Sequence, residues 1–359
     1  MEANHHSSLL IYKEMSMEKT QVADSKDNIC PDYAKMTSKQ KIDAIWTLQV
    51  FHPILKSVLE KIDRCHKSYG RAGEPENLFI SGITGLGKTT LCKIYLQRYP
   101  NIQNNSDDKI PVLYARTPTP ATIKNLASGL LEAMGDPCSD RGTTVTITKR
   151  LKTYLKACGV ELIILDEFQH LNGTENKLYQ AADWLKALIE DSNVPIVVIG
   201  LPESTGVLNT NSQLNRRFSH RCDLEPFGWE SAEDRKFFTS LLHTIDLKLP
   251  FPERTQLASE DLKPRIFDAS DGVFGDLIKL IRFSAQYSIE ENHQRIQIKS
   301  FIRAYEEHIK PRKPDKENPF IPKNFFIESM PGKNKAIMNG LNGRIRPGKR
   351  DQGLEVLKS

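Results

Sequence analysis

An eight-residue segment, residues 82–89, matches the pattern G-x-x-x-x-G-K-[S/T] at every fixed position. Glycines relax the steric limits on φ, so such a loop can turn its backbone N–H groups toward phosphate oxygens. Lys88 is expected to neutralise the β- and γ-phosphates of a nucleotide, and the Thr89 hydroxyl to ligate Mg²⁺. A glycine-rich turn without a ligand is the alternative. We therefore expect ATP and Mg²⁺ as cofactors, with nucleotide contacts from Gly82, Ile83, Thr84, Gly85, Leu86, Gly87, Lys88, Thr89 and Thr90.

A pair of carboxylates follows a short apolar run further along the chain. Residues 162–165 are Leu-Ile-Ile-Leu, and they lead directly into Asp166 and Glu167. A buried strand that ends in two acids presents them at the carboxyl edge of a parallel sheet, where phosphates bind. We expect Asp166 to hold Mg²⁺ through water, and Glu167 to orient and deprotonate the attacking water. Two acids on an inert surface are the alternative.

Two adjacent arginines, Arg216 and Arg217, precede Phe218. In ATPases that form rings, arginines at this place reach the site of the neighbouring subunit, where their planar charge stabilises the transferred phosphoryl group. Of the two we expect Arg217 to have this role, because it adjoins Phe218. Pairing with a carboxylate of the same subunit is the alternative for both.

Three further positions bear on how such a site senses the γ-phosphate. Leu201 follows an expected strand, where ring ATPases usually carry a polar sensor residue, so the sequence departs from that pattern. Lys279 and Arg282 lie on a later expected helix and are candidates for a second sensor. Packing and solvent exposure are the alternative roles for both.

The elements that must position these residues alternate between apolar strands and amphipathic helices. Five strands joined by helices predict a doubly wound α/β core with a parallel sheet. The expected strands cover residues 77–81, 111–115, 162–165, 194–200 and 221–224. We expect a flexible segment over 1–36, a nucleotide-binding α/β domain with N-terminal helices over 37–226, a small helical lid over 227–310 and a flexible basic tail over 311–359.

The composition is that of a soluble globular protein, with 39% hydrophobic and 26% charged residues. No apolar run approaches the roughly 18 residues that span a bilayer, and no signal peptide is visible, so we expect a cytoplasmic protein. Six scattered cysteines without a C-x-x-C pair fit a reducing compartment. Residues 311–359 hold eleven basic against five acidic residues. This tail is expected to dock on a protein through Pro319 and Phe320, to touch DNA through Arg344, Arg346, Lys349 and Arg350, or to be inert.

Several segments together resemble the TnsC/TniB regulators of transposition. The similar segments are GITGLGKT at 82–89, KACGVE at 156–161 with LIILDEFQHL after it, VVIGLPES at 197–204, LNRRF at 214–218 and GVFGDLIKLI at 272–281. These regulators are AAA+ ATPases of transposons related to the seventh bacterial Tn element, including CRISPR-associated ones. The likeness covers about residues 39–310.

The resemblance implies an AAA+ domain with a five-stranded parallel sheet and a helical lid. It implies a homo-oligomer, a ring or filament, that uses ATP and encloses double-stranded DNA without reading its sequence. The oligomer would link a target-selection protein of the TniQ/TnsD type to a TnsA/TnsB-type transposase in the bacterial nucleoid, without a membrane. The residues matching the family's DNA contacts are Lys124, Arg141, Thr143, Thr144, Lys149 and Arg150. From composition alone these are ordinary helix-surface residues.

Two other functions remain open at this point. A helicase loader or replication initiator of the DnaC/IstB or Cdc6 kind has a related AAA+ core, and a dedicated DNA-reading domain would favour it. A phosphotransferase acting on a small molecule is the other. The acid pair at residues 166–167 argues against it, because such a pair suits the activation of water.

Overall fold

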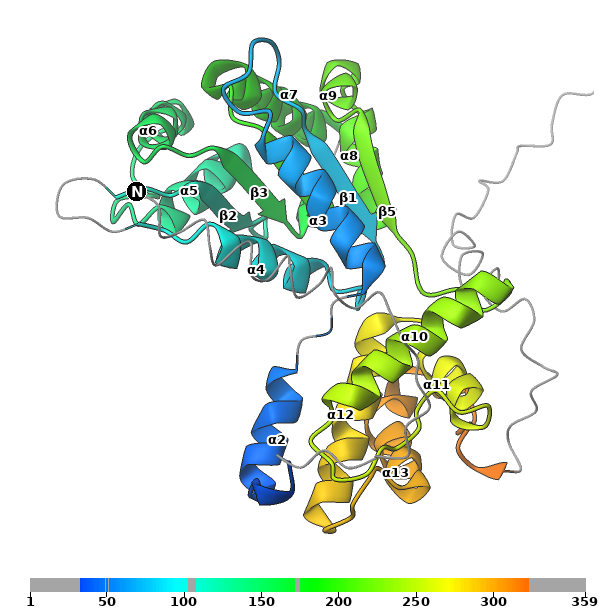
Figure 1. Ribbon diagram of the computed structural model, residues 1–359. Helices are drawn as coiled ribbons and strands as arrows, with labels where there is room; N and C mark the ends of the chain where they lie inside the picture. Colours follow the sequence, from blue (N-terminus) through cyan, green and yellow to red (C-terminus); the bar gives the residue numbers. More distant parts are fainter. Residues whose placement is uncertain (1–32, 49, 51, 103–107, 172–174, 323–359) are drawn as a thin grey trace, which may run out of the picture.

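The computed structural model describes residues 33–48, 50, 52–102, 108–171 and 175–322. Its α/β part is built on one sheet of five parallel strands, which confirms the expected doubly wound core (Figure 1). Across the sheet the strands are β2 (Val112–Arg116), β3 (Leu162–Asp166), β4 (Ile196–Gly200), β1 (Leu78–Gly82) and β5 (His220–Leu224). Every residue of the three central strands is buried, because helices cover both faces of the sheet.

Successive residues of each strand pack against different helices. On one face, Ile80 of β1 joins a core with α3 (Pro53–His66) and α4 (Lys88–Arg98). On the other face, Phe79 joins a core with α5 (Ile123–Ala133), α6 (Thr144–Ala157), α7 (Glu175–Ser192), α8 (Thr205–Asn209) and α9 (Ser212–Arg217). This alternation fixes which way each strand end points its polar side chains.

Polar caps set the starts of the helices that follow β2. The Thr122 hydroxyl accepts a hydrogen bond from the backbone N–H of Asn125 at 3.1 Å, where α5 begins. The Thr143 hydroxyl accepts from the N–H of Thr146 at 3.2 Å, where α6 begins. Such caps satisfy backbone donors that the first helical turn leaves open.

The helical lid contains α10 (Ala232–Lys248), α11 (Leu262–Ser270), α12 (Phe274–Glu290) and α13 (Ile298–His308), below the sheet in Figure 1. Helix α2 (Ser38–Thr47) packs on this lid and not on the sheet. The indole N–H of Trp46 donates to Gln286 at 3.1 Å, and its ring lies edge-on to Phe283. The lid therefore includes a helix that the sequence assigned to the nucleotide-binding domain. No helix among the described residues is both long and apolar enough to cross a bilayer.

The prediction of a flexible tail from residue 311 is wrong for residues 311–322, which fold onto the lid. Phe320 is 1% exposed and its ring stacks on Phe301 at 5.0 Å, so it is not free to dock on a partner. Lys313 contacts Asp271 at 2.9 Å and Asp276 at 3.1 Å. The basic residues of this segment therefore form ion pairs with acids of the lid. The first 32 residues and the other tail arginines and lysine, at 344, 346, 349 and 350, lie outside the described residues.

We expect Phe320→Ala to lower the free energy of unfolding of the lid by about 3–5 kcal/mol, because it empties a fully buried aromatic site. Urea unfolding followed by far-UV circular dichroism measures this. Tyr179→Ala is the matched control, because that ring is 54% exposed and its loss should change stability by less than about 0.5 kcal/mol. Equal stability of the two variants would contradict the packing of residues 311–322.

Candidate nucleotide-binding site

The loop at residues 82–89, here called the P-loop, connects the end of β1 to the start of α4. Two of its glycines have left-handed backbone angles, with φ of 90° at Gly85 and 86° at Gly87. Gly82 is required for a different reason, because a Cβ atom there would lie 2.9 Å from backbone and side-chain atoms of Leu224. The sequence pattern therefore corresponds to a loop that tolerates no side chain at three positions.

Lys88 begins α4 and folds back over the P-loop. Its ammonium donates to the carbonyl oxygens of Gly82 at 2.6 Å and Ile83 at 2.9 Å. Burial lowers the pKa of Lys88, while the nearby Glu167 and Asp166 act in the opposite direction. The cation is thus held at the mouth of the loop and faces two carboxylates, as the predicted phosphate and magnesium chemistry requires.

Thr89 and Asp166 meet, although 77 positions separate them in the sequence. The Thr89 hydroxyl donates to Asp166 Oδ2 at 3.0 Å, and the Tyr114 hydroxyl donates to the same oxygen at 3.0 Å. Burial raises the pKa of Tyr114 to about 12, so it remains a donor at neutral pH. The Thr117 hydroxyl oxygen is buried without a partner among the described residues, and its backbone N–H donates to the carbonyl of Asp166. Such hydroxyl and carboxylate oxygens are the ligands that Mg²⁺ prefers, so this corner fits the ion.

Glu167 differs from its neighbour in environment. Asp166 is 1% exposed, whereas 40% of the Glu167 side chain is open to solvent. Glu167 has a left-handed φ of 57°, an uncommon angle for this residue type. Gln169 donates a hydrogen bond from its amide to Glu167, and the His170 ring lies 3.9 Å from the same carboxylate. A buried carboxylate and a water-accessible carboxylate are therefore side by side.

A family model described as bacterial TniB protein matches residues 47–228, just over half of the 359-residue chain. This stretch contains the P-loop and both carboxylates. The chain belongs to the TniB family. The ORC1-type DNA replication protein 1 of Sulfolobus acidocaldarius is 28% identical over 162 residues, which are 44% of this chain and 36% of that protein. The match thus spans about a third of the relative.

Two solved structures resemble the fold of this TniB-family chain. ORC1 of Aeropyrum pernix, solved in complex with DNA, has a TM-score of 0.54 at 17% identity and covers 77% of this chain and 71% of its own. Cdc6p of Pyrobaculum aerophilum has a TM-score of 0.54 at 14% identity, covering 74% and 70%. Together with the strand order, this likeness establishes the AAA+ fold.

The lid contacts the P-loop through the first turn of α12. The backbone N–H of Gly275 donates to the carbonyl of Gly85 at 2.7 Å, and a Cβ atom on Gly275 would lie 2.7 Å from that oxygen. His52, which precedes α3, is 4% exposed, lies 4.9 Å from the Phe274 ring and has no polar partner among the described residues. Burial lowers the pKa of His52 to about 4, so the ring is neutral. A glycine and a neutral ring thus form the junction between lid and P-loop.

Lys279 and Arg282, the two candidates for a second sensor, form their contacts with other parts of the lid. Lys279 donates to the carbonyl of His308 at 3.0 Å, inside the lid. Arg282 donates to the carbonyl of Leu48 at 2.9 Å and lies over the Trp46 ring. Both side chains therefore tie lid elements together, which is the packing role that the sequence left open.

The two arginines at the end of α9 have different surroundings. Arg217 is 13% exposed and pairs with Glu190 at 2.7 Å and Glu74 at 3.4 Å, which is the local alternative. Arg216 is exposed and has no ion pair with any described residue. Of the two arginines, Arg216 is therefore the one that is open to solvent, whereas Arg217 is held by acids of its own subunit.

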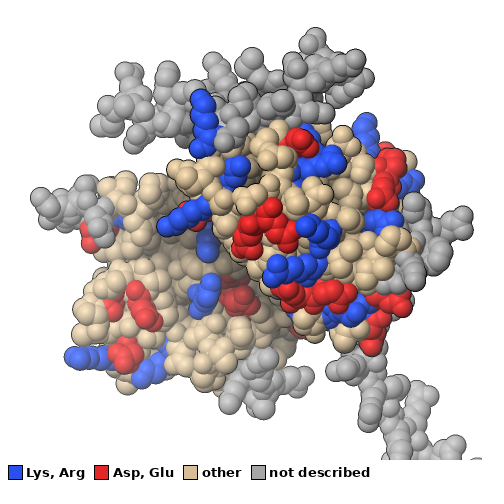
Figure 2. All heavy atoms as spheres, turned by 90° about the horizontal axis from the view of Figure 1, so that it is seen from below, with Lys and Arg blue, Asp and Glu red and all other residues tan. Residues whose placement is uncertain are grey.

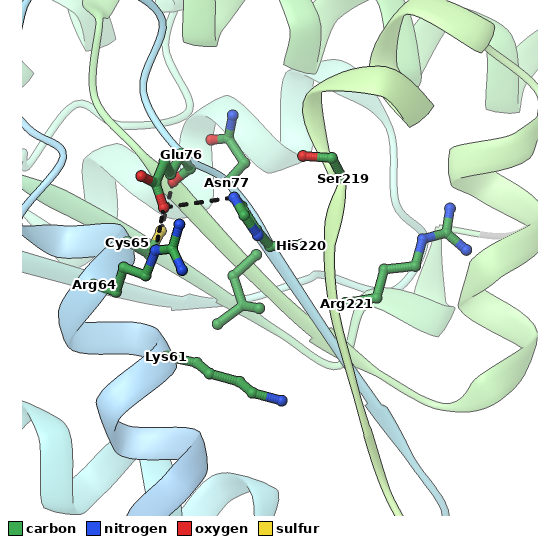
Figure 3. A pocket seen from close by; sticks show the side chains of 9 residues that line it. Lys61, Arg64, Cys65, Glu76, Asn77, Ser219, His220 and Arg221 are labelled. Carbon is green, nitrogen blue, oxygen red and sulfur yellow. Dashed lines mark hydrogen bonds and ion pairs between the residues drawn. The ribbon is translucent and has the colours of Figure 1, made fainter.

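A cavity of about 290 Å³ lies at the opposite end of β1 from the P-loop (Figure 3). There Glu76 pairs with Arg64 at 2.9 Å and with His220 at 3.5 Å. Asn77, on the same wall, donates to the carbonyl of Arg217 at 3.5 Å and accepts from the N–H of Ile196 at 2.8 Å. This end of the sheet fixes the end of α9 and is separate from the nucleotide site.

The residues that match the family's DNA contacts lie on α5, on α6 and on the loop before α6. Lys124, Arg141 and Lys149 are exposed, whereas Arg150 pairs with the buried Asp136 at 2.8 Å. Arg150 also donates to the carbonyls of Cys138 and Ser139, so it holds the loop before α6. On the face of the molecule seen in Figure 2, basic and acidic side chains are interspersed without a single basic field.

Proposed function

We propose that this TniB-family protein is an ATPase that assembles on double-stranded DNA and regulates transposition. It would connect a target-selection protein of the TniQ/TnsD type to a TnsA/TnsB-type transposase. The observation that supports this most is the convergence of Lys88, Thr89, Asp166 and Glu167 at one edge of the sheet. The family match adds the transposition context.

In the proposed reaction, water attacks the γ-phosphorus of ATP and the bond to the β–γ bridging oxygen breaks. Glu167 takes the proton of the water, and the electron pair of the broken bond leaves on ADP. Lys88 offsets the charge that develops on the phosphate oxygens. Mg²⁺, when held by Thr89 and Asp166, would polarise the β- and γ-phosphates.

Assembly would complete this site. The exposed Arg216 lies close to the start of β5, an edge strand of the sheet, whereas the acids lie at the carboxyl end of β3. A guanidinium on that edge would reach the γ-phosphate of an adjacent subunit and not its own. ATP at the subunit interface would then favour the assembled state, because the nucleotide binds that state more tightly.

DNA contact would come from Lys124, Arg141 and Lys149, with Thr143 and Thr144 at the start of α6. The Thr143 hydroxyl already accepts a hydrogen bond from the N–H of Thr146 as the cap of α6. Only its O–H donor would therefore be available to a phosphate. Arg150 is left out of this set, because it already neutralises Asp136. Such contacts bind the backbone without reading bases.

A replication initiator or helicase loader is the second candidate, supported by the similarity to the ORC1-type protein. One comparison of activities distinguishes the two functions. A transposition regulator stimulates joining of transposon ends by its transposase, whereas a loader deposits a replicative helicase on DNA.

We expect rings or filaments in negative-stain images only when ATP and duplex DNA are both present. The double variant Arg141→Ala/Lys149→Ala should form them only at raised protein concentration. Fluorescence anisotropy should show weaker DNA binding, with a salt dependence reduced by about two phosphate contacts.

The matched control is Lys93→Ala/Lys248→Ala, which removes the same charge from exposed positions on α4 and α10. Equal DNA binding by the two double variants would overturn the DNA site. Single particles of the unaltered protein under every condition would overturn the assembly proposal.

A further inference from the structure

Residues 311–322, here called the strap, follow α13 and fold back onto the lid (orange in Figure 1). A buried ring and a hydrogen bond fix the end of the strap. Phe320 stacks on Phe301, and Arg265 of α11 donates to the carbonyl oxygen of Pro319 at 2.6 Å. None of the side chains at 311–317 is buried, so charged contacts hold the beginning of the strap.

Lys313 of the strap lies between two aspartates of the lid. Its ammonium is 2.9 Å from Asp271, which follows the last turn of α11, and 3.1 Å from Asp276, in the first turn of α12. Arg312 contacts Asp276 as well, at 2.6 Å. One lysine therefore joins the end of one lid helix to the start of the next.

Lys316 adds a second bridge beside the first. It contacts Asp271 at 2.5 Å and Asp268 at 3.3 Å. The side chains of Lys313 and Lys316 are each 19% exposed and that of Asp271 is 22% exposed, so salt screens these pairs less than open surface pairs. Burial alone would raise the pKa of Asp271, but Lys316 and Lys313 hold this pKa below its ordinary value. The shared acid is therefore ionised at neutral pH.

The two acids that Lys313 joins flank the turn of the lid that touches the P-loop. This turn, residues 272–275, links α11 to α12. The N–H of Gly275 donates to the carbonyl of Gly85 at 2.7 Å, and a Cβ atom on Gly85 would lie 3.0 Å from the Val273 side chain. The strap therefore holds the part of the lid that rests on the P-loop.

We propose that the strap is an ionic latch that keeps the lid on the P-loop and thereby slows the release of bound nucleotide. This inference rests on the proposed binding of ATP and adds its regulation. For the nucleotide to leave, the turn at 272–275 must move away from the P-loop, and such local opening costs the contacts that it breaks. The ion pairs of Lys313 and Lys316 are among these contacts, because their acids flank the turn.

The test measures how fast a fluorescent ADP leaves the full chain in a stopped-flow chase with excess ADP, without DNA. The double variant Lys313→Ala/Lys316→Ala should release it about tenfold faster, the scale of one lost hydrogen bond to a charged group. Added NaCl should speed release from the unaltered chain more than from this variant, because salt screens the pairs that the variant lacks.

Asp271→Asn is a second way to break the latch, and it keeps the test valid if the double variant does not fold. Asp271 has a left-handed φ of 51°, which asparagine also tolerates, so the turn should keep its shape. The variant loses the charge that Lys313 and Lys316 share, and it should also release ADP faster. Thermal melting checks that each variant is folded.

Two controls separate the effect of charge from that of packing and of net charge. Lys313→Arg/Lys316→Arg keeps both charges and should release ADP at the unaltered rate. Lys299→Ala/Lys310→Ala removes two other lysines of the lid, whose acidic partners are at the end of α12 and on α13. It should leave the release rate unchanged, because these pairs do not flank the turn.

Equal release rates for the latch variants and the controls would overturn the proposal, and so would slower release from the latch variants. A chain that does not bind ADP at all would remove the proposed function and the latch with it. A chain that binds ADP but does not hydrolyse ATP would count against the proposed function alone, because the latch concerns binding.

Discussion

Replacing Glu167 with glutamine is expected to lower the kcat of ATP hydrolysis by about 10²–10⁴-fold, the usual contribution of a general base. The amide has nearly the same shape but cannot take a proton from water. Lys88, Thr89 and Asp166 keep their contacts, so the affinity for ATP should be retained. Phosphate release in the presence of DNA measures the first effect, and titration with a fluorescent ATP analogue measures the second.

Glu203→Gln is the control for this variant. Glu203 is exposed, follows β4 and acts on the charge of Lys88, so its loss changes the local field without removing the base. Its kcat should stay within about threefold of the unaltered protein, because exposed charges in water interact weakly. A Glu167→Gln protein that retains full turnover would show that another group takes the proton.

The phosphate-binding part of the site was predictable because its chemistry depends on local sequence. The P-loop needs glycines at fixed spacing, and the acid pair needs only a buried strand before it. The strands themselves lie within two residues of the predicted ones at each end. The three central strands are mainly apolar because helices cover both of their faces.

The partners of those residues were not predictable in the same way, because they come from other elements. Tyr114 reaches Asp166 only because β2 and β3 are adjacent in register. Gln169, which follows β3, accepts a hydrogen bond from the N–H of Leu201, which follows β4, only because these two strands are adjacent. The alternation of apolar residues shows that a strand exists, but it does not tell which strand will lie next to it.

Charged residues were the hardest to assign, because a charge on the surface and a charge in a pair look alike in the sequence. Arg150 follows the predicted DNA-binding loop, yet it forms an ion pair with the buried Asp136. Lys313 belongs to a stretch with several prolines and basic residues, yet it pairs with Asp271 and Asp276 of the lid. Only the three-dimensional position of the acids separates these cases from Arg141, which is exposed and has no ion pair among the described residues.

Arg216 and Arg217 give the second large expected effect. We expect Arg216→Ala to lower DNA-stimulated hydrolysis by about 10³–10⁵-fold, the range for an arginine that stabilises the phosphoryl group in trans. Arg217→Ala should instead lower stability, because Glu74 would lose its ion pair with Arg217 and Glu190 the closer of its two, the other being with Lys186 at 4.0 Å. Phosphate release and thermal melting of the two variants measure these opposite outcomes.

Mixing two inactive variants tests whether the arginine acts between subunits. Arg216→Ala keeps Glu167, and Glu167→Gln keeps Arg216, so some interfaces of a mixed oligomer contain one intact copy of each. Those interfaces should recover hydrolysis, although neither variant has it alone. If Arg216 acted within its own subunit, mixing would restore nothing, because no subunit would hold both groups. Recovery also requires that subunits assemble side by side, so the mixture tests the arginine and the oligomer together.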